Sequence, residues 1–247
     1  MKYKDLFIDF DDTLYDTYGN ANIALHETFR HFRLQQYCPN PQIFFDAYWA
    51  ANIDLWKRYA KGEITRDYLI IERFRRPLLA ASSPTSSTAT SGDVGEWLSE
   101  AFILEISDQF LDYCASKPGV VDGAHELMDY LKGKGYRLHL CSNGFHEVQY
   151  KKLNACGLRD HFDTIILSED AGANKPSPLY FDYAFKVSGA KPETTLMIGD
   201  NYQTDIQGAL KSGINALLFN RWGEKQFDPQ FPPTYIVDSL LSIKNIL

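Results

Sequence analysis

Four acidic residues crowd the end of a short apolar run near the start of the chain. Residues 6–8 read as a buried strand, and Asp9, Asp11, Asp12 and Asp16 follow it. Mutual repulsion and loss of hydration make such a cluster costly unless a cation lies among the carboxylates. The cluster therefore predicts a site of chemistry that includes a cation.

Carboxylates with this spacing suit phosphoryl transfer. An aspartate is ionised at neutral pH because its reference pKa is about 3.9, so Asp9 could attack a phosphorus atom. The aspartyl-phosphate that forms is labile, and water could then release phosphate. Asp11 could protonate the leaving alkoxide and then deprotonate that water, and we expect its acidic neighbours to keep it protonated for the first step. Since two anions must meet here, the hard cation Mg²⁺ is expected as cofactor.

Elements that could position these residues recur from residue 136 onward. Apolar segments read as strands at 136–142, 162–167, 194–199 and 214–220, in addition to residues 4–8 near the N-terminus. Helical patterns at 146–157, 177–189 and 202–213 separate them. This alternation predicts an α/β fold, a Rossmann-like three-layer α/β/α core with a parallel sheet.

Further polar residues follow the later strands of this predicted sheet. They are Ser142 and Asn143, Lys175, Asp200 and Asp205. Ligands collect at the carboxyl ends of the strands in open α/β sheets, so we expect these side chains to converge with Asp9 and Asp11.

Residues 16–117 have a different character. Helical patterns cover 20–32, 43–60 and 65–79, with no convincing strand among them. Residues 82–92 include eight Ser or Thr in "SSPTSSTATSG", which predicts a mobile surface loop. We therefore expect a catalytic core of residues 1–15 and 118–247, interrupted by an α-helical cap of residues 16–117.

Composition excludes several classes of protein. The net charge of −7 argues against binding a nucleic-acid polymer, because phosphate neutralisation needs clustered Lys and Arg. No apolar stretch approaches the roughly 20 residues of a membrane span. The four cysteines show no CxxC spacing, which favours free thiols in a reducing compartment. A cytoplasmic enzyme, monomer or homodimer, acting on a small metabolite is expected.

Four motifs, in order along the chain, resemble those of the haloacid dehalogenase-like hydrolase superfamily. They are "DFDDT" at 9–13, Ser142 in "LCSNG", Lys175 in "NKPSP", and Asp200 with Asp205 in "IGDNYQTD". The helical insert is similar to the α-helical type-1 cap of this family. Asp12 is a departure, since many members have Gly there.

This resemblance implies a role for each motif. Magnesium would be held by the side chains of Asp9 and Asp200 and the backbone carbonyl of Asp11, with Asp205 nearby or as an alternative ligand. Ser142, Asn143 and Lys175 would bind the phosphoryl oxygens, and Ser142 and Lys175 would join Asp9 and Asp11 as catalytic residues.

The acid at position 11 decides between branches of the family. Members that cleave carbon–halogen bonds lack it because no alkoxide leaves, so Asp11 favours a phosphatase. The stretch "DFDDTLYDT" resembles the branch with pyrimidine 5′-nucleotidases, which implies a nucleoside 5′-monophosphate as one candidate substrate. Aromatic residues of the insert could stack a base or fill its core, and core packing is favoured. They are Tyr48, Trp49, Trp56 and Tyr59.

Two alternatives stay open at this point. A phosphomutase needs a cap with basic residues that grip phosphate, and Arg66, Arg73, Arg75 and Arg76 could provide them. A receiver-like signalling domain also uses acids, a hydroxyl and a lysine on a parallel sheet. Its phospho-accepting aspartate follows a later strand, however, and it has no cap.

Overall fold

The computed structural model describes residues 2–82, 97–223 and 226–247, and it divides into two compact units. The first unit, here called the core, comprises Met1–Asn20 and Ala115–Leu247, and the second, the insert, comprises Ala21–Cys114. The sequence places the division a few residues further out, at 15 and 118. The expected mobile loop at 82–92 lies, apart from Ser82, outside the described residues.

The chain segments that lead into and out of the insert are hydrogen-bonded to each other within the core. Tyr15 and Val120 form an antiparallel bridge. The Asn20 side chain donates to the Gly119 carbonyl at 2.7 Å, and the Asp16 amide donates to the same carbonyl at 3.2 Å. The first turn of the helix that begins at Thr17 is therefore part of the core, which explains why the division lies beyond residue 15.

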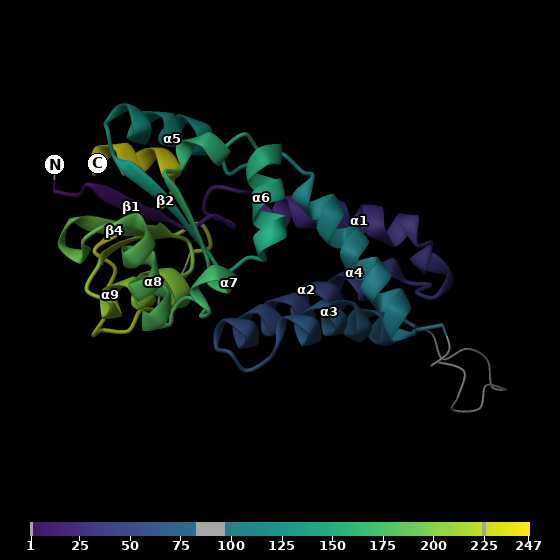
Figure 1. The fold of residues 1–247 in the computed structure, drawn as a ribbon. Helices are drawn as coiled ribbons and strands as arrows, with labels where there is room; N and C mark the ends of the chain where they lie inside the picture. The colour runs from purple at the N-terminus through teal and green to yellow at the C-terminus, as the bar shows by residue number, and fades with distance from the viewer. Residues whose placement is uncertain (1, 83–96, 224–225) are drawn as a thin grey trace. The chain divides into compact units, whose positions relative to one another are not determined.

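Six parallel strands form the sheet of the core, in the order β3-β2-β1-β4-β5-β6 (Figure 1). They are β1 (Asp5–Ile8), β2 (Arg137–Ser142), β3 (Thr164–Leu167), β4 (Thr195–Gly199), β5 (Asn215–Phe219) and β6 (Tyr235–Val237). Five of these strands were predicted. The sixth, β6, was missed because it has three residues at the sheet edge and no long apolar run.

Helices cover both faces of this sheet (Figure 1). They are α5 (Ala124–Gly133), α6 (His146–Ala155), α7 (Ser168–Ala171), α8 (Pro178–Ser188) and α9 (Gly208–Lys211), with the 3₁₀-helices η2 (Arg159–His161), η3 (Pro192–Thr194) and η5 (Leu240–Asn245). Side chains of a strand alternate between faces, so Leu6 and Ile8 pack with α5 and η5 while Phe7 packs with α8 and α9. The predicted α/β/α core is confirmed.

One predicted helix has an unexpected beginning. The segment 202–213 starts as the π-helix η4 (Tyr202–Gln207) and only then continues as α9. The Asn201 side chain accepts the amides of Gln203 and Thr204 at 3.0 and 3.1 Å, while the Asn201 amide donates to the Asp205 carboxylate at 3.1 Å. These hydrogen bonds favour a wide first turn of the helix, in which the Asp205 side chain points back toward β4. Such turns are common at functional sites.

The helices α1 (Thr17–His31), α2 (Pro41–Ala60), α3 (Arg66–Ala81) and α4 (Glu100–Ala115), with the 3₁₀-helix η1 (Leu34–Gln36), build the insert, although the ends of α1 and α4 lie in the core. Aromatic side chains fill its centre. The Tyr48 ring lies 5.4 Å from Phe74 and 5.5 Å from Phe110, and all three are buried. Tyr48 is thus packed in the hydrophobic interior of the insert, as the favoured interpretation of the aromatic residues holds.

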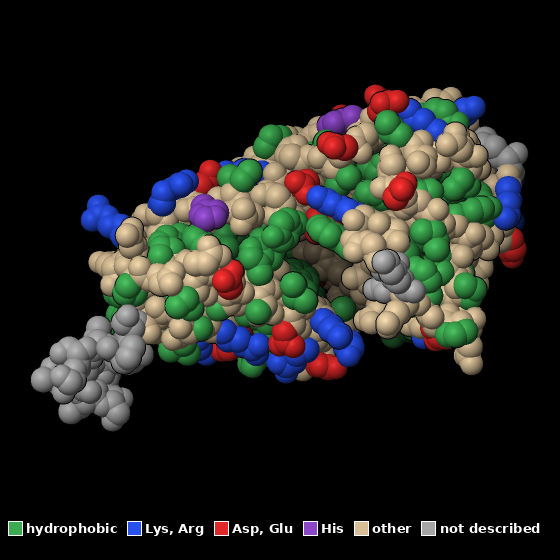
Figure 2. All heavy atoms as spheres, turned by 180° about the vertical axis from the view of Figure 1, so that it is seen from behind, with side chains coloured by type: hydrophobic (Ala, Val, Ile, Leu, Met, Phe, Trp, Pro, Cys, Tyr) green, Lys and Arg blue, Asp and Glu red, His purple; other side chains and the backbone are tan. Residues whose placement is uncertain are grey.

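Figure 2 shows Lys and Arg side chains beside Asp and Glu on the side turned away from the view of Figure 1. Across the described residues, no helix combines the length and the apolar character that crossing a membrane requires. All four cysteines are buried free thiols.

Candidate active site

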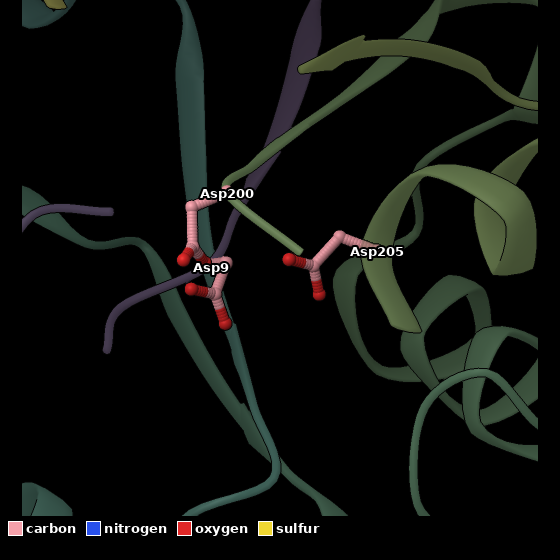
Figure 3. A group of neighbouring side chains, drawn as sticks. All are labelled: Asp9, Asp200 and Asp205. Carbon is pink, nitrogen blue, oxygen red and sulfur yellow. The ribbon is translucent and has the colours of Figure 1, made fainter. Parts of the chain in front are cut away.

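Three carboxylates from separate segments meet at the carboxyl ends of the strands. Asp9 follows β1, Asp200 follows β4 and Asp205 lies in η4, and their side chains point toward one another (Figure 3). One oxygen from each lies within 4.8 Å of the others. β1 and β4 are neighbours at the centre of the sheet. From β1 the strands continue to β2 and β3 on one side, and from β4 they continue to β5 and β6 on the other. The acids therefore occupy the topological switch point, where α/β sheets bind ligands.

Lys175 lies between two of these acids. Its ammonium group donates to Asp9 Oδ1 at 2.7 Å, to Asp205 Oδ1 at 2.8 Å and to the Cys141 carbonyl at 2.7 Å. An ammonium has three protons, so every donor is used. The side chain is almost completely buried, which fixes one positive charge among the acids.

The Asn143 side chain holds the backbone of Lys175. Its Nδ2 donates to the Lys175 carbonyl at 2.9 Å, and its Oδ1 accepts the Lys175 amide at 2.8 Å. Sequence reasoning expected Asn143 to bind phosphate. The side-chain amide is committed to Lys175, and phosphate binding by the backbone amides around Asn143 stays a prediction.

Burial and like charges disturb the ionisation of the acids. Burial raises the pKa of Asp9 to about 7, against the opposing charge of Lys175. Burial, followed by the charges of Asp9 and Asp205, raises the pKa of Asp200 well above its ordinary value. For Lys175, the two neighbouring carboxylates outweigh the effect of burial, so its pKa is raised and it stays charged.

Thr13 is hydrogen-bonded to both Asp9, which follows β1, and Asp200, which follows β4. Its Oγ1 donates to Asp9 Oδ2 at 2.9 Å and accepts the Asp200 amide at 3.1 Å. The carboxylate of Asp200 accepts, at Oδ2, a hydrogen bond from the indole N–H of Trp222 at 2.9 Å. Neither Thr13 nor Trp222 was predicted to be a site residue, although Thr13 belongs to the first motif.

Gly199, the last residue of β4, makes room for Asp205. A Cβ atom at this position would lie 2.3 Å from Asp205 Oδ2 and 2.6 Å from Asp205 Cγ. Any larger residue would therefore push the carboxylate away from Lys175. This contact gives a physical reason for the Gly-Asp pair in the fourth motif.

Asp11 is surrounded by hydrogen-bond donors. Thr17 Oγ1 and Lys152 Nζ lie 2.6 and 2.5 Å from its Oδ1, and Gln149 Nε2 lies 2.5 Å from its Oδ2. Ser142 Oγ is also near Oδ2, at 3.4 Å.

Sequence reasoning expected neighbouring acids to keep Asp11 protonated, and this was wrong. Burial by itself raises the pKa of Asp11, but the charge of Lys152 and the hydrogen bonds from Lys152, Thr17 and Gln149 outweigh it. The pKa of Asp11 is therefore lowered.

Ser142 has partners on both sides of its hydroxyl group. Its Oγ accepts hydrogen bonds from the backbone N–H of Gly144 at 3.0 Å and from the side-chain Nε2 of Gln149 at 2.6 Å. Because α6 begins only at His146, Ser142 does not cap that helix. Its proton is free to be directed at Asp11 or at a bound phosphoryl oxygen.

Gln149 and Lys152 are contacts of the site that sequence reasoning missed. The helix that carries them was predicted at 146–157, but no role was assigned to its polar residues. A signal was available, because positions 149 and 152 share a helix face with the buried Leu153 and Cys156. Two polar residues on a buried face predict a buried polar partner.

The remaining acids of the N-terminal cluster, Asp12 and Asp16, pair with an arginine after β5. Arg221 lies 3.2 Å from Asp12 Oδ1 and 2.6 Å from Asp16 Oδ1. Asp12 Oδ1 also accepts the Tyr18 amide at 3.1 Å, in the first turn of α1. Asp12 has φ 62°, a left-handed conformation that Asp tolerates better than most residues. This explains how Asp can stand where many family members have Gly.

The arrangement of Asp9, Asp200 and Asp205 fits a hard divalent cation. Three clustered carboxylates share the single ammonium group of Lys175, which leaves excess negative charge at the point where their oxygens converge. Oxygen ligands are those that Mg²⁺ prefers. Burial and neighbouring carboxylates raise the pKa values of Asp9 and Asp200, and a cation bound among these acids would oppose both effects.

Fold and site together define a hydrolase in which an aspartate after the first strand lies among acids and a buried lysine. Residues 3–213 match the family model of the haloacid dehalogenase-like hydrolases, and the chain belongs to this family. The resemblance drawn from the four motifs is thereby confirmed.

Relatives match the chain over its full length. It is 30% identical to the pyrimidine 5′-nucleotidase PynA of Streptococcus pneumoniae, with 100% of this chain and 98% of PynA covered. It is also 30% identical to the pyrimidine 5′-nucleotidase YjjG of Escherichia coli, with 100% and 99% covered. A solved structure of the HAD-hydrolase YfnB from Bacillus subtilis, bound to magnesium, has a TM-score of 0.82 at 28% identity, covering 100% of this chain and 99% of that one. The predicted enzyme class is confirmed: the chain is a phosphoric monoester hydrolase.

Proposed function

We propose that the protein hydrolyses a small phosphorylated metabolite, with a nucleoside 5′-monophosphate as the favoured class, through a phosphoryl group carried by Asp9. The observation that carries this proposal is the position of Asp9 at the switch point of the sheet. One of its oxygens is bound by Lys175 and the other by Thr13, and Asp11 follows two residues later.

In the first half-reaction, an oxygen of Asp9 attacks phosphorus and the ester P–O bond breaks. Asp11 takes up a proton as the negatively charged phosphate enters the site, and it gives this proton to the alkoxide that leaves. Lys175 holds a fixed positive charge beside the attacking carboxylate, and the Ser142 hydroxyl donates to a phosphoryl oxygen as charge shifts onto it.

In the second half-reaction, Asp11 takes a proton from water while the water oxygen attacks phosphorus. The bond between phosphorus and Asp9 breaks, and inorganic phosphate leaves. Asp11 thus regains the proton that it gave up, and Asp9 returns as a carboxylate.

We propose Mg²⁺ as the cofactor, held by the side chains of Asp9 and Asp200 and the backbone carbonyl of Asp11, with Asp205 beside it. When bound, it neutralises the charge that repels an incoming phosphate and polarises the phosphoryl group. The cluster of carboxylate oxygens and the magnesium in the YfnB structure support this assignment.

The nucleotide as substrate is supported by the two nucleotidase relatives, PynA and YjjG, which match over their whole length. The mutase alternative loses support because arginines that could grip a second phosphate are paired within the insert. They are Arg73 with Ser107 at 3.1 Å, Arg75 with Glu72 at 2.9 Å, and Arg76 with Asp54 at 3.0 Å. Family membership also leaves no support for the receiver-like alternative.

A screen of phosphorylated metabolites, with Mg²⁺ and with a chelator, tests the proposal. Phosphate release should require Mg²⁺, should be fastest with a nucleoside 5′-monophosphate, and should vanish in Asp9→Asn. Acid quenching during turnover should trap phosphate on the wild-type chain but not on that variant. Release that persists in Asp9→Asn would contradict the mechanism, and preference for another phosphate ester would contradict the substrate class.

A further inference from the structure

Two side chains of α6 contact both oxygens of Asp11 from the same direction. Lys152 Nζ lies 2.5 Å from Oδ1, and Gln149 Nε2 lies 2.5 Å from Oδ2. Residues three positions apart lie side by side on a helix, so one rigid element provides both donors. Gln149 Nε2 is also 2.6 Å from Ser142 Oγ, which connects this pair to the second motif.

The burial of these two side chains is difficult to explain by folding alone. Gln149 is completely buried and Lys152 is 7% exposed. Among the described residues, Gln149 Oε1 has no hydrogen-bond partner. Apolar side chains of similar size could fill this space without the loss of hydration that an amide and an ammonium suffer. What the pair adds is the placement of Asp11.

The loop before α6 is shaped to admit the Gln149 side chain. A Cβ atom on Gly144 would lie 1.9 Å from Gln149 Nε2 and 2.5 Å from its Cδ. The Gly144 position therefore allows the amide to pass between the loop and Asp11. It is a second, independent feature of the chain that depends on where this amide lies.

Resting on the proposed function, we infer that Gln149 and Lys152 are positioning residues that hold Asp11 as the base of the second half-reaction. Both present N–H donors, which complement a carboxylate that acts only as acceptor. A carboxylate is the form that removes a proton from the attacking water. Without the pair, Asp11 can rotate away, and release of phosphate from Asp9 becomes slow.

Pre-steady-state hydrolysis of p-nitrophenyl phosphate separates the two half-reactions, because p-nitrophenolate leaves without a proton. We expect Lys152→Met to release one equivalent of p-nitrophenol rapidly and then to turn over at least about 100-fold more slowly than wild type, the scale of lost general base catalysis. Phosphate should accumulate on Asp9 in acid-quenched samples, and KM should not rise. Gln149→Leu should show the same burst, and Lys152→Arg should restore part of the turnover.

Matched variants give the inference its controls. Lys151→Met changes the exposed neighbouring lysine and should behave like wild type. In an Asp11→Asn background, adding Lys152→Met should change turnover by less than about twofold, because the residue acts through Asp11. Gly144→Ala should produce the burst by displacing Gln149, and it replaces Lys152→Met as the test if that variant does not fold.

Two results would overturn the inference. One is a Lys152→Met enzyme with wild-type turnover. The other is a slow Lys152→Met enzyme with raised KM and no burst, which would make Lys152 a direct ligand of the substrate. Wild-type protein that hydrolyses neither p-nitrophenyl phosphate nor a nucleoside monophosphate would instead contradict the proposed function, and this inference with it.

Discussion

The ammonium nitrogen of Lys175 lies 2.8 Å from Oδ1 of Asp205, and both side chains are almost completely buried. A buried charge that loses its partner is costly, because neither water nor a counterion replaces it. We expect Lys175→Met to lower the free energy of unfolding by about 3–5 kcal/mol and to abolish turnover. Urea denaturation measures the first effect. Lys186→Met, on an exposed position of α8, is the control and should change little; equal stability of the two variants would contradict the prediction.

Metal binding should stabilise the fold through Asp200. A ligand that binds only the folded state adds about 2.7 kcal/mol at 100 times its Kd, so saturating Mg²⁺ should raise the melting temperature by several degrees. Asp200→Asn removes one of the three clustered carboxylates and should abolish most of that rise. Differential scanning fluorimetry with and without Mg²⁺ measures the effect, with the exposed Asp182→Asn as control. An undiminished rise in Asp200→Asn would place the metal elsewhere.

Gly199→Ala should disturb the site without removing any functional group. The added methyl group would overlap the Asp205 carboxylate, which must then leave Lys175. Overpacking of this kind typically costs about 1–3 kcal/mol, and we expect turnover to fall by at least about tenfold. Gly133→Ala offers a matched control at the end of α5, where a Cβ meets nothing within 4 Å. Full activity of Gly199→Ala would show that Asp205 is not needed in its present place.

Acid sensitivity should depend in part on His139, which lies far along β2 from the acids. It is buried beside Asp5, with Nε2 3.0 Å from Asp5 Oδ1, and burial lowers its pKa below the usual 6.5. The unfolded chain therefore binds a proton near pH 6 that the folded chain does not. The contribution of His139 to stability should therefore rise with pH in that range and fall on acidification, by up to about 1.4 kcal/mol per pH unit.

The variant His139→Gln keeps a donor for Asp5 but cannot take up a proton. Its unfolding free energy, measured by urea denaturation between pH 5 and 7, should lose less on acidification than that of wild type. His125→Gln, at an exposed position on α5, should retain the wild-type slope. Identical slopes for His139→Gln and wild type would contradict the prediction.

Most of the core and its convergent acids could be predicted because the evidence is local. In a parallel sheet, residues that follow separate strands lie at the same end of the strands. The proximity of Asp9 and Asp200 could therefore be predicted from their positions after β1 and β4. The pairings made by Lys152 with Asp11 and by Arg221 with Asp12 could not be predicted in the same way. They depend on which helix face turns inward and on where the loop after β5 returns, and both are set by tertiary packing.

Local hydrogen bonding explains the other differences. The apolar pattern of 202–213 indicates a helix, but it carries no sign that Asn201 and Asp205 would widen its first turn. In the same way, an asparagine that follows a serine at the end of a strand reads as a phosphate ligand. Only the structure reveals that Asn143 is paired with the backbone of Lys175.

The bridge between Tyr15 and Val120 has a consequence for how such enzymes diversify. Because the segment before residue 21 is hydrogen-bonded to the segment after residue 114, the two ends of the insert are held together within the core. The entropy cost of a longer loop grows only logarithmically once its ends are held together. The insert can therefore change in length or sequence during evolution while the residues of the active site keep their positions in the core.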